Sequence, residues 1–386
     1  MPASRGSRRW HGDGAPAAAG RNGAHEVTIR EQVTLAGYTT LGLGGPAARF
    51  IEAGTDQQVI DAVRDADRRG EPVLVLGGGS NLVVADAGFP GTVVRVATRG
   101  IAAAPDGDRV AVRVAAGENW DTVVDWCVRG GLSGIECLSG IPGVAGATPI
   151  QNVNAYGQDV ADTITAVRAY DRRRDALTEL SNADCGFGYR TSFFKRAAAG
   201  TATGRFVVLG ITFRLARDPL SAPVRYAELA RALGVAEGGR VPLAAARAAV
   251  LRLRRAKGMV LDPADPDTRS VGSFFTNPVL DGDQFAALAK TVEAGWGAEV
   301  RIPCFAAEPG QFKVPAAWLI ERAGFGKGYP GGAGPRISTK HTLALVNPGG
   351  ASTTALLALA REIRDGVREA FGVELVSEPV LVGARL

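Results

Sequence analysis

The chain has 386 residues, 46% hydrophobic and 22% charged, a composition typical of a folded globular protein rather than a disordered or coiled-coil one. Its length predicts two or three domains. The formal charge is +5, but the many arginines are scattered, which is typical of a coding bias and gives little support to nucleic-acid binding. The 51 glycines are the unusual feature, because glycine is used where the backbone turns sharply or approaches another group closely.

The cysteines and histidines indicate no metal chemistry. Cys127, Cys137, Cys185 and Cys304 are widely spaced and the three histidines form no ligand cluster, so we expect reduced thiols, no metal site and a cytoplasmic protein. No apolar run approaches the roughly 18 residues of a membrane span, so we expect no membrane insertion. Residues 1–26 lack the apolar core of a secretory signal, and we expect a disordered tail there.

The first half of the chain alternates predicted strands and helices. Thr55 can cap a helix that Gly70 ends, and a second helix is expected at 120–129. Alternating or short apolar runs predict strands at 48–53, 72–76, 92–96, 110–115, 164–170 and 206–215. Residues 130–160 are rich in Gly, Pro and Asn without periodicity, which predicts a long functional loop.

The second half begins after a linker predicted at 217–223. A helix is expected from Pro242 to Gly258, followed by an Asp- and Pro-rich loop at 259–270. The apolar spacing over 353–371 predicts a long amphipathic helix, and 373–382 reads as a closing strand in which Pro379 indicates an edge or an entry position.

Two glycine-rich segments are candidates for binding an anion. Gly77-Gly78-Gly79-Ser80-Asn81 follows a predicted buried strand, and consecutive glycines let several backbone N–H groups point into one concavity, although a plain tight turn fits the pattern equally well. The loop at 140–157 offers a second such surface. The G-x-G-x-x-A match at 42–47 is followed by a strand pattern instead of a helix, which argues against a Rossmann fold.

Three polar residues are candidates for chemistry, and each has a structural alternative. Arg190 lies between aromatics in a short strand-like stretch and can clamp a carboxylate or stack on the surface. Ser273 lies between a glycine and two aromatics, where a hydroxyl is either a core group or a proton donor. Glu378 is a lone carboxylate in an apolar segment, which makes it a site residue or an ion-pair partner.

In order, these segments resemble the UDP-N-acetylenolpyruvoylglucosamine reductase family from about residue 38 to residue 383. The resemblance is carried by TTLGLGG near Thr40, VLGGGSNLV at 75–83, IPG..GATPIQN..AYG at 141–157, YRTSFFK at 189–195, GSFFTNP at 272–278, AAWLIERAGFGKGYPGGA at 316–333 and SEPV at 377–380.

The resemblance implies an α+β fold in two domains behind the tail. Residues 27–218 would form a two-lobed FAD-binding domain of the vanillyl-alcohol-oxidase/PCMH type, with lobes at about 27–97 and 98–218. Residues 219–386 would form an α+β substrate-binding domain whose last strand returns to the active site. A monomer is expected.

The resemblance also implies the reaction. NADPH would reduce FAD, and the enolpyruvyl group of the UDP-sugar would then receive hydride at the carbon beta to its carboxylate, giving UDP-N-acetylmuramate for peptidoglycan synthesis. Ser273 would protonate the alpha carbon, Arg190 would clamp the carboxylate and Glu378 would stabilise the aci-form. FAD would be held by Gly77, Gly78, Gly79, Ser80, Asn81, Leu82, Ile141, Gly143, Thr148, Asn152 and Gly157, and the substrate by Tyr226, Lys257, Asn277 and Arg254. Tyr226 resembles the tyrosine of the subclass in which a loop covers the substrate.

Two other functions fit parts of the pattern. An oxidase of the related sugar or alcohol type often attaches its flavin through histidine, and no histidine occurs between His25 and His341. A regulator that binds sugar nucleotides without catalysis would be expected to lack Ser273, Arg190 or Glu378, and all three are present.

Overall fold

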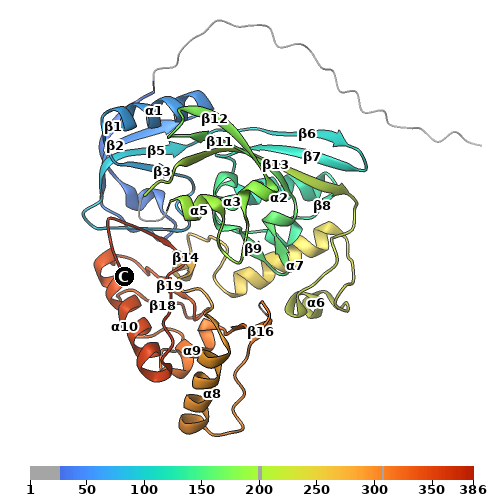
Figure 1. Cartoon of the computed structure of the whole chain (residues 1–386), viewed down its shortest axis with the longest axis vertical. Helices are drawn as coiled ribbons and strands as arrows, with labels where there is room; N and C mark the ends of the chain where they lie inside the picture. The colour runs from blue at the N-terminus through green and yellow to red at the C-terminus, as the bar shows by residue number, and fades with distance from the viewer. Residues whose placement is uncertain (1–26, 199–201, 307) are drawn as a thin grey trace, which may run out of the picture.

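Two β-sheets lie side by side in the upper part of the computed structural model in Figure 1, and a unit with long helices lies below them. The structure describes residues 27–198, 202–306 and 308–386, so the tail predicted at 1–26 lies outside the described residues. Within the described part of the chain, no helix has both the length and the apolar character needed to cross a membrane.

The first lobe is a four-stranded sheet with the order β1-β2-β5-β3. Its helix α1 begins after Thr55, whose side chain accepts from the Gln58 amide in a capping box, and buries Val59, Ile60 and Val63. Strand β3 runs directly into the glycine loop that starts at Gly77. The elements are β1 (Ile29–Thr34), η1 (Leu35–Tyr38), β2 (Pro46–Ala53), α1 (Asp56–Arg68), β3 (Val73–Leu76), β4 (Leu82–Val84) and β5 (Phe89–Val96).

The second lobe is an antiparallel sheet with the order β12-β11-β13-β7-β6, and β8 pairs with the end of β13. The segment 130–160, predicted as one loop, instead contains short strands and helical turns that are too brief to leave a periodic pattern. The elements are β6 (Ile101–Asp106), β7 (Arg109–Ala115), α2 (Trp120–Arg129), β8 (Leu132–Ser133), η2 (Glu136–Leu138), η3 (Ala145–Ala147), α3 (Thr148–Gln151), β9 (Asn154–Ala155), β10 (Gln158–Asp159), η4 (Val160–Asp162), β11 (Ile164–Asp171), β12 (Ala176–Ser181), α4 (Asn182–Cys185), α5 (Phe193–Ala197) and β13 (Phe206–Arg217).

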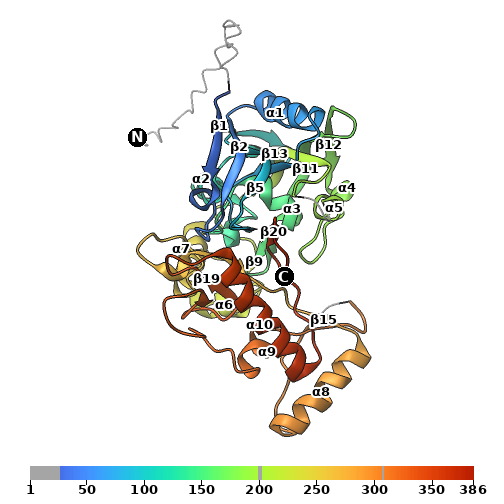
Figure 2. The same cartoon turned by 90° about the vertical axis from the view of Figure 1, so that its left-hand side faces the viewer.

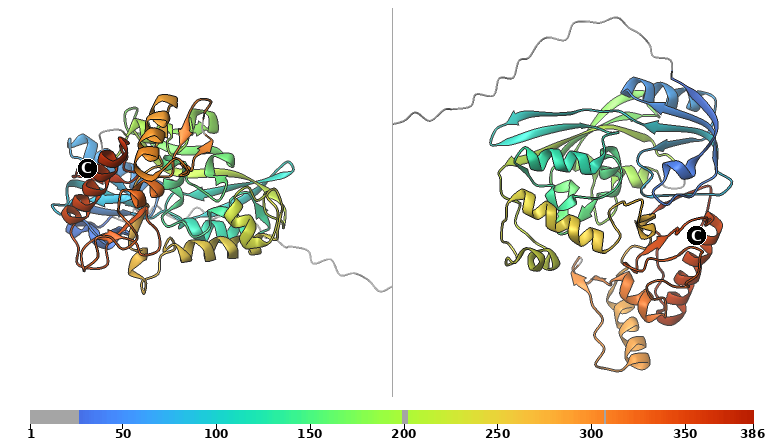
Figure 3. Two further views of the ribbon diagram at one scale, coloured as in Figure 1. Left: turned by 90° about the horizontal axis from the view of Figure 1, so that it is seen from below. Right: turned by 180° about the vertical axis from the view of Figure 1, so that it is seen from behind.

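Two helices follow the predicted linker and pack on the second lobe. Helix α6 (Ala227–Leu233) and helix α7 (Leu243–Ala256) share a core with Cys137, and α7 contacts α2, as Figure 1 and the right-hand view of Figure 3 show. The domain boundary at 218/219 remains a prediction, because these two helices belong by sequence to the second predicted domain and by packing to the first.

The lower unit has its own core around helix α10, which buries Leu356, Ile363 and Val367 and spans the 353–371 segment as predicted. The remaining elements are η5 (Pro266–Thr268), β14 (Ser270–Ser273), β15 (Val279–Leu280), α8 (Gly282–Trp296), β16 (Phe305–Ala306), β17 (Phe312–Lys313), α9 (Ala316–Arg322), β18 (Arg336–Ile337), β19 (Ala344–Val346), α10 (Thr353–Phe371) and β20 (Val380–Val382).

The closing strand is shorter than predicted. Only β20 is a strand, and the one strand-like pairing of residues 373–379 is an isolated bridge between Ser377 and Phe275. Strand β20 pairs in parallel with β4, so the end of the chain returns to the first lobe, where Figure 2 shows it beneath that lobe. The prediction was wrong in length because the apolar pattern of 373–382 reflects packing into the lower core and not sheet pairing, with Val373 and Leu375 both buried there.

Candidate active site

The glycine loop lines a cavity of about 1130 Å³ between the two lobes and the returning strand β20. We call it the glycine-loop cavity. Its wall includes Gly77, Gly78, Gly79, Ser80, Asn81, Leu82, Val144, Gly146, Ala147, Ile150, Gln151, Thr191, Phe194, Lys195 and the segment 380–385.

Only glycine fits in this loop. A Cβ atom at Gly78 would lie 2.6 Å from the Cα atom of Gly143, because the two predicted glycine loops pack directly against each other. Gly79 has φ of +62°, and a Cβ there would collide with the carbonyl oxygen of Tyr38. The close approach of the two loops therefore accounts for this dense glycine run.

The loop presents donors that the described residues do not use. In the hydrogen bonds of residues 27–198, 202–306 and 308–386, the backbone N–H groups of Gly77, Gly78, Gly79 and Ser80 do not appear as donors. The buried Asn81 Nδ2 also has no partner. Several unpaired N–H donors on one wall suit an anionic group such as the diphosphate of a dinucleotide cofactor.

The other predicted FAD residues lie around this cavity without lining it. Gly143 packs against Ser80, and Ile141 packs against the core of the two lobes. The Thr148 hydroxyl donates to the carbonyl of Ala145, and the Asn152 amide donates to that of Gly188. Gly157 has φ of +82° and lies beside Arg225, near the predicted substrate residue Tyr226.

Ser273, Arg190 and Glu378 come from three distant segments and converge. Ser273 ends β14, and the carbonyl of the next residue, Phe274, accepts from the Glu378 N–H at 2.8 Å. The Arg190 Nε atom lies 3.6 Å from Glu378 Oε1 in a mostly buried ion pair. No hydrogen bond of the described residues uses the Ser273 hydroxyl. The three predicted residues therefore form one cluster.

Arg190 does not lie in a strand. It lies in a tight turn closed by a bridge between Gly188 and Thr191, with φ of +98°, a region that residues with a Cβ rarely adopt. The alternation of GFGYRTSFFK predicts a strand, but Ser192 instead caps helix α5 by accepting from the Lys195 amide. The prediction was wrong because the glycines and the capping serine outweigh the aromatic residues.

Burial sets the charge state of this cluster. Burial raises the pKa of Glu378 above its usual value, although the positive charges of Arg190 and Lys195 oppose the shift. Burial also lowers the pKa of Lys195. Asp159, which feels the charges of Arg190 and Lys313, likewise has a pKa raised by burial. Several perturbed groups around Arg190, one of which, Lys195, lines the glycine-loop cavity, are typical of an active site.

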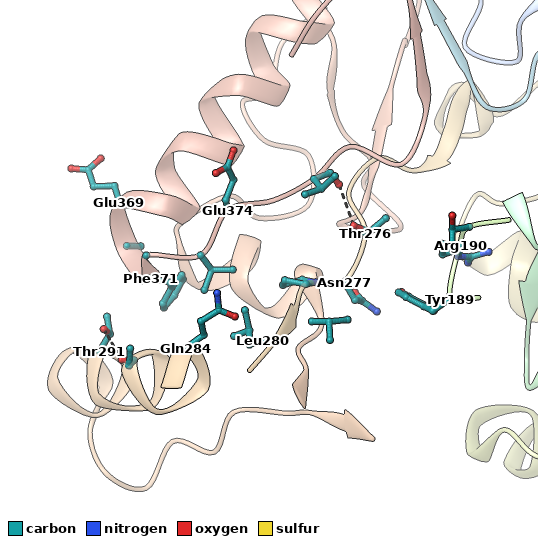
Figure 4. Close-up of a pocket in the computed structure, with 18 of the residues that line it drawn as sticks. Tyr189, Arg190, Thr276, Asn277, Leu280, Gln284, Thr291, Glu369, Phe371 and Glu374 are labelled. Atoms are coloured by element: carbon teal, nitrogen blue, oxygen red, sulfur yellow. Dashed lines mark hydrogen bonds between the residues drawn. The ribbon is translucent and has the colours of Figure 1, made fainter. Parts of the chain in front are cut away.

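A second hollow, which we call the Arg190 groove, leads away from the cluster between α8 and the end of α10. In Figure 4, Tyr189 and Arg190 face Asn277 and Thr276 near one end, and Thr291, Glu369 and Phe371 lie at the other. Thr191 and Lys195 line both this groove and the glycine-loop cavity. The two hollows thus share a wall.

The predicted substrate residues lie on two sides of the site. Asn277 lines the Arg190 groove, and its Oδ1 atom accepts from the Ala316 amide. Tyr226 packs edge-on against Tyr156, with ring centroids 5.4 Å apart. Lys257 pairs with Glu228 at 2.7 Å and lies 5.8 Å from the Tyr156 ring centroid.

Arg254 lies in the last turn of α7, and Lys257 follows directly at the end of that helix. Arg254 donates to the Met259 carbonyl, while its buried Nε atom has no partner. Burial lowers the pKa of Arg254 to about 10, so it remains a cation at neutral pH.

Two residues of the site have no predicted role: Gln151, which the sequence offers only as a polar tip of the 140–157 loop, and Lys195. Gln151 lines the glycine-loop cavity and accepts from Lys195 Nζ at 2.9 Å. Both lie in segments that the sequence marks, the 140–157 loop and YRTSFFK, but a polar residue in a glycine-rich loop and a lysine in a short helix carry no distinctive pattern.

Unpaired backbone donors between two α+β lobes suit the diphosphate of a dinucleotide, and the family models identify the class as FAD-binding proteins. A family model described as an FAD binding domain matches residues 46–178, and one described as the C-terminal domain of UDP-N-acetylenolpyruvoylglucosamine reductase matches residues 263–382.

Curated relatives identify the particular family. A UDP-N-acetylenolpyruvoylglucosamine reductase of Thermobifida fusca is 59% identical over 93% of this chain and 99% of its own length. One from Streptomyces coelicolor is 58% identical over 91% of this chain and 90% of its own. The crystal structure of the Thermus caldophilus reductase covers 92% of this chain and 99% of its own, with 26% identity and a TM-score of 0.58.

The chain belongs to the UDP-N-acetylenolpyruvoylglucosamine reductase family. The predicted fold class, the FAD and NADPH cofactors and the assignment as an oxidoreductase are confirmed. Family membership decides against the alternatives of an oxidase and of a regulator without catalysis.

Proposed function

We propose that Ser273, Arg190 and Glu378 carry out the reduction of the enolpyruvyl group of UDP-N-acetylenolpyruvoylglucosamine to UDP-N-acetylmuramate, with electrons that pass from NADPH through FAD. The overall reaction, a step of peptidoglycan precursor synthesis, follows from membership of the family. The observation that carries the residue assignment is the convergence of three segments: Arg190 pairs with Glu378, whose backbone N–H donates to the residue after Ser273, and the groove lined by Arg190 shares Thr191 and Lys195 with the glycine-loop cavity.

The glycine-loop cavity fits FAD. Its wall offers the N–H groups of Gly77 to Ser80 and the Asn81 amide, which suit the diphosphate, while Val75, Ile150 and Phe206 supply apolar surface for the rings. When bound, FAD supplies the hydride for the reaction.

Arg190 and Glu378 stabilise the charge that develops on the substrate. Hydride addition at the beta carbon pushes an electron pair through the alpha carbon onto the carboxylate, which becomes an enolate. The Arg190 guanidinium can hold that carboxylate in two parallel hydrogen bonds. Glu378, whose pKa burial raises, donates a hydrogen bond to the same group when protonated.

Ser273 completes the reaction by giving its proton to the alpha carbon. A serine hydroxyl is a weak acid, so it protonates carbon only when it is correctly placed as the enolate forms. Strand β14 fixes its backbone, because the Phe274 N–H donates to Leu343 at 2.7 Å. Position rather than acidity is therefore the contribution of Ser273.

The nucleotide end of the substrate is assigned to Tyr226, Lys257, Arg254 and Asn277. Lys257 and Arg254 supply positive charge for a diphosphate, and Tyr226 is exposed enough to fold over the nucleotide. Glu228, which pairs with Lys257, would have to share that cation with the ligand.

We also propose a cytoplasmic monomer that binds no nucleic acid. All four cysteines are free, and burial raises the pKa of Cys127 to about 12, which leaves an unreactive thiol suited to a reducing compartment. Gel filtration of the purified protein tests the monomer directly.

The experiment that tests the proposed function separates the two half-reactions. The purified protein should be yellow, and it should oxidise more than one equivalent of NADPH per flavin only when the enolpyruvyl substrate is present. In Ser273→Ala, reduction of the flavin by NADPH should stay within about twofold of wild type, while reoxidation by substrate should slow by about 10² or more. Equal slowing of both steps would contradict the role of Ser273 as proton donor. A colourless protein that cannot be reconstituted with FAD would contradict the function itself.

A further inference from the structure

Lys195 occupies the wall between the two hollows of the site. Its helix α5 is only Phe193–Ala197, but the Ser192 hydroxyl caps that helix and also donates to the Ile150 carbonyl at 2.7 Å, next to Gln151. Ser192 is fully buried. The backbone that carries Lys195 is therefore tied to the segment that lines the glycine-loop cavity.

The ammonium group of Lys195 bridges the two hollows through two hydrogen bonds. Lys195 Nζ donates to Gln151 Oε1 at 2.9 Å and to the carbonyl oxygen of Arg190 at 3.0 Å. An ammonium has no acceptor, so the oxygen of the Gln151 amide must face it. The NH₂ group of Gln151 is thereby left as the donor that this residue can present to the cavity.

The second hydrogen bond fixes an unfavourable backbone conformation. Arg190 has φ of +98°, which costs a residue with a Cβ on the order of 1–3 kcal/mol and persists only where the surroundings enforce it. Lys195 holds the carbonyl of that same residue. The conformation in turn directs the Arg190 side chain to Glu378.

The charge of Lys195 also acts on the catalytic pair. The positive charge of Lys195, like that of Arg190, acts to lower the pKa of Glu378 and so favours its ionised form. Because Lys195 is itself partly buried, bulk water screens its charge only in part. Two cations beside Glu378 leave a net positive charge for the carboxylate of a substrate whether Glu378 is protonated or ionised.

We propose that Lys195 is a positioning residue that couples the glycine-loop cavity to the Arg190–Glu378 pair. Lys195 orients the Gln151 amide toward the glycine-loop cavity, where the cofactor is proposed to bind. It also holds the backbone of Arg190, which is proposed to bind the substrate carboxylate. The inference rests on the role proposed for Arg190 above.

The first test is Lys195→Met in the holoenzyme, with rapid-mixing measurements of the two half-reactions. Reoxidation by substrate should slow by about tenfold or more, because Arg190 relaxes and a charge is lost, while reduction by NADPH changes by less than about threefold. The visible absorption band and the midpoint potential of the bound flavin should both shift, because the Gln151 amide is free to rotate. Lys290→Met, on the exposed face of α8, is the matched control and should change neither rates nor spectrum.

The second test asks whether Lys195 acts through Arg190. In an Arg190→Met background, adding Lys195→Met should slow reoxidation by less than about twofold further. Multiplicative effects of the two substitutions, or an unchanged spectrum and potential in Lys195→Met, would overturn the proposal. If Lys195→Met does not retain FAD, Lys195→Gln is judged by the same criteria.

The single variant Arg190→Met distinguishes a failure of the inference about Lys195 from a failure of the role proposed for Arg190. If Arg190→Met is slow in reoxidation and Lys195→Met is as fast as wild type, the inference about Lys195 fails and the proposed function stands. If Arg190→Met is fast, the role proposed for Arg190 fails, and coupling through it is overturned as well.

Discussion

The glycine-loop cavity and the Arg190 groove share the wall formed by Thr191 and Lys195, but they are built from different groups. The cavity offers backbone amides on a loop that packs directly against a second loop of the same chain, so its chemistry depends on the absence of side chains. The cluster beside the groove offers charged side chains whose state depends on burial. Substitutions that add a side chain should therefore impair cofactor binding in the glycine-loop cavity. Changes of pH or charge should instead impair the reaction at the cluster beside the Arg190 groove.

The largest effect is expected from Gly79→Ala. The added methyl group collides with the Tyr38 carbonyl oxygen and meets a positive φ, so the loop must move and its amides lose their alignment. The purified variant should contain less than about a tenth of the wild-type FAD by absorbance, as expected for a severe backbone clash.

Gly37→Ala is the matched control for this loop, because no atom lies within 4 Å of the added methyl group. It should retain full FAD content. Normal FAD content in Gly79→Ala would break the comparison, since the cavity would then tolerate side chains.

A smaller effect is expected from Glu378→Gln, and it depends on pH. Burial raises the pKa of Glu378, so the protonated donor survives to a higher pH than in a free glutamate and is lost as pH rises through the shifted value. In the wild-type protein, reoxidation of the flavin by substrate should therefore slow as the pH rises through the pKa of Glu378. The glutamine variant, which keeps a neutral donor, should react within about tenfold of wild type at low pH and show no such decline. The same alkaline decline in both proteins would show that another group titrates.

The smallest effect concerns stability and involves His341, which lies near the positive charges of Lys257, Lys327 and Arg254. Burial, followed by these cations, lowers the pKa of His341 to about 4. The unfolded chain takes up this proton near pH 6.5 and the folded chain only near 4, so the free energy of unfolding falls as pH drops between these values. The loss attributable to this group is up to about 3 kcal/mol, at 1.36 kcal/mol for each pKa unit.

His341→Gln checks this prediction. Urea unfolding of both proteins at pH 4.5 and pH 7 should show a smaller drop in the variant, because its side chain does not titrate in this range. Carboxylates contribute to acid destabilisation equally in both, so an identical drop would contradict the role of His341.

The sequence predicts the parts of this molecule that depend on local chemistry. The capping box at Thr55, the apolar face of 353–371 and the glycine loop after β3 each have a local cause and were predicted in place. Ser273, Arg190 and Glu378 are each marked as candidates by the sequence, but only the structure brings their segments together, and their catalytic roles stay a prediction.

What could not be predicted depends on which of several competing contacts each segment makes. Arg190 lies in a turn that the lysine five residues later stabilises, and the apolar segment at 373–379 packs in the lower core instead of pairing in a sheet. The side chains of Thr148 and Asn152 are bonded to the backbone: each donates to a carbonyl, and the Asn152 oxygen also accepts from the Ala161 amide, while their role in holding FAD stays a prediction. Residue type alone does not distinguish these outcomes.

The parallel pairing of β20 with β4 has a consequence for how the protein matures. Val380 pairs with Leu82, and segment 380–385 forms part of the cavity wall, so the cavity is complete only after a residue near the end of the chain has docked beside one near its beginning. Contacts so distant in sequence form late in folding because their loop-closure entropy is large. Cofactor capture then becomes a final assembly step, and flavin retention reports that both ends of the molecule have come together.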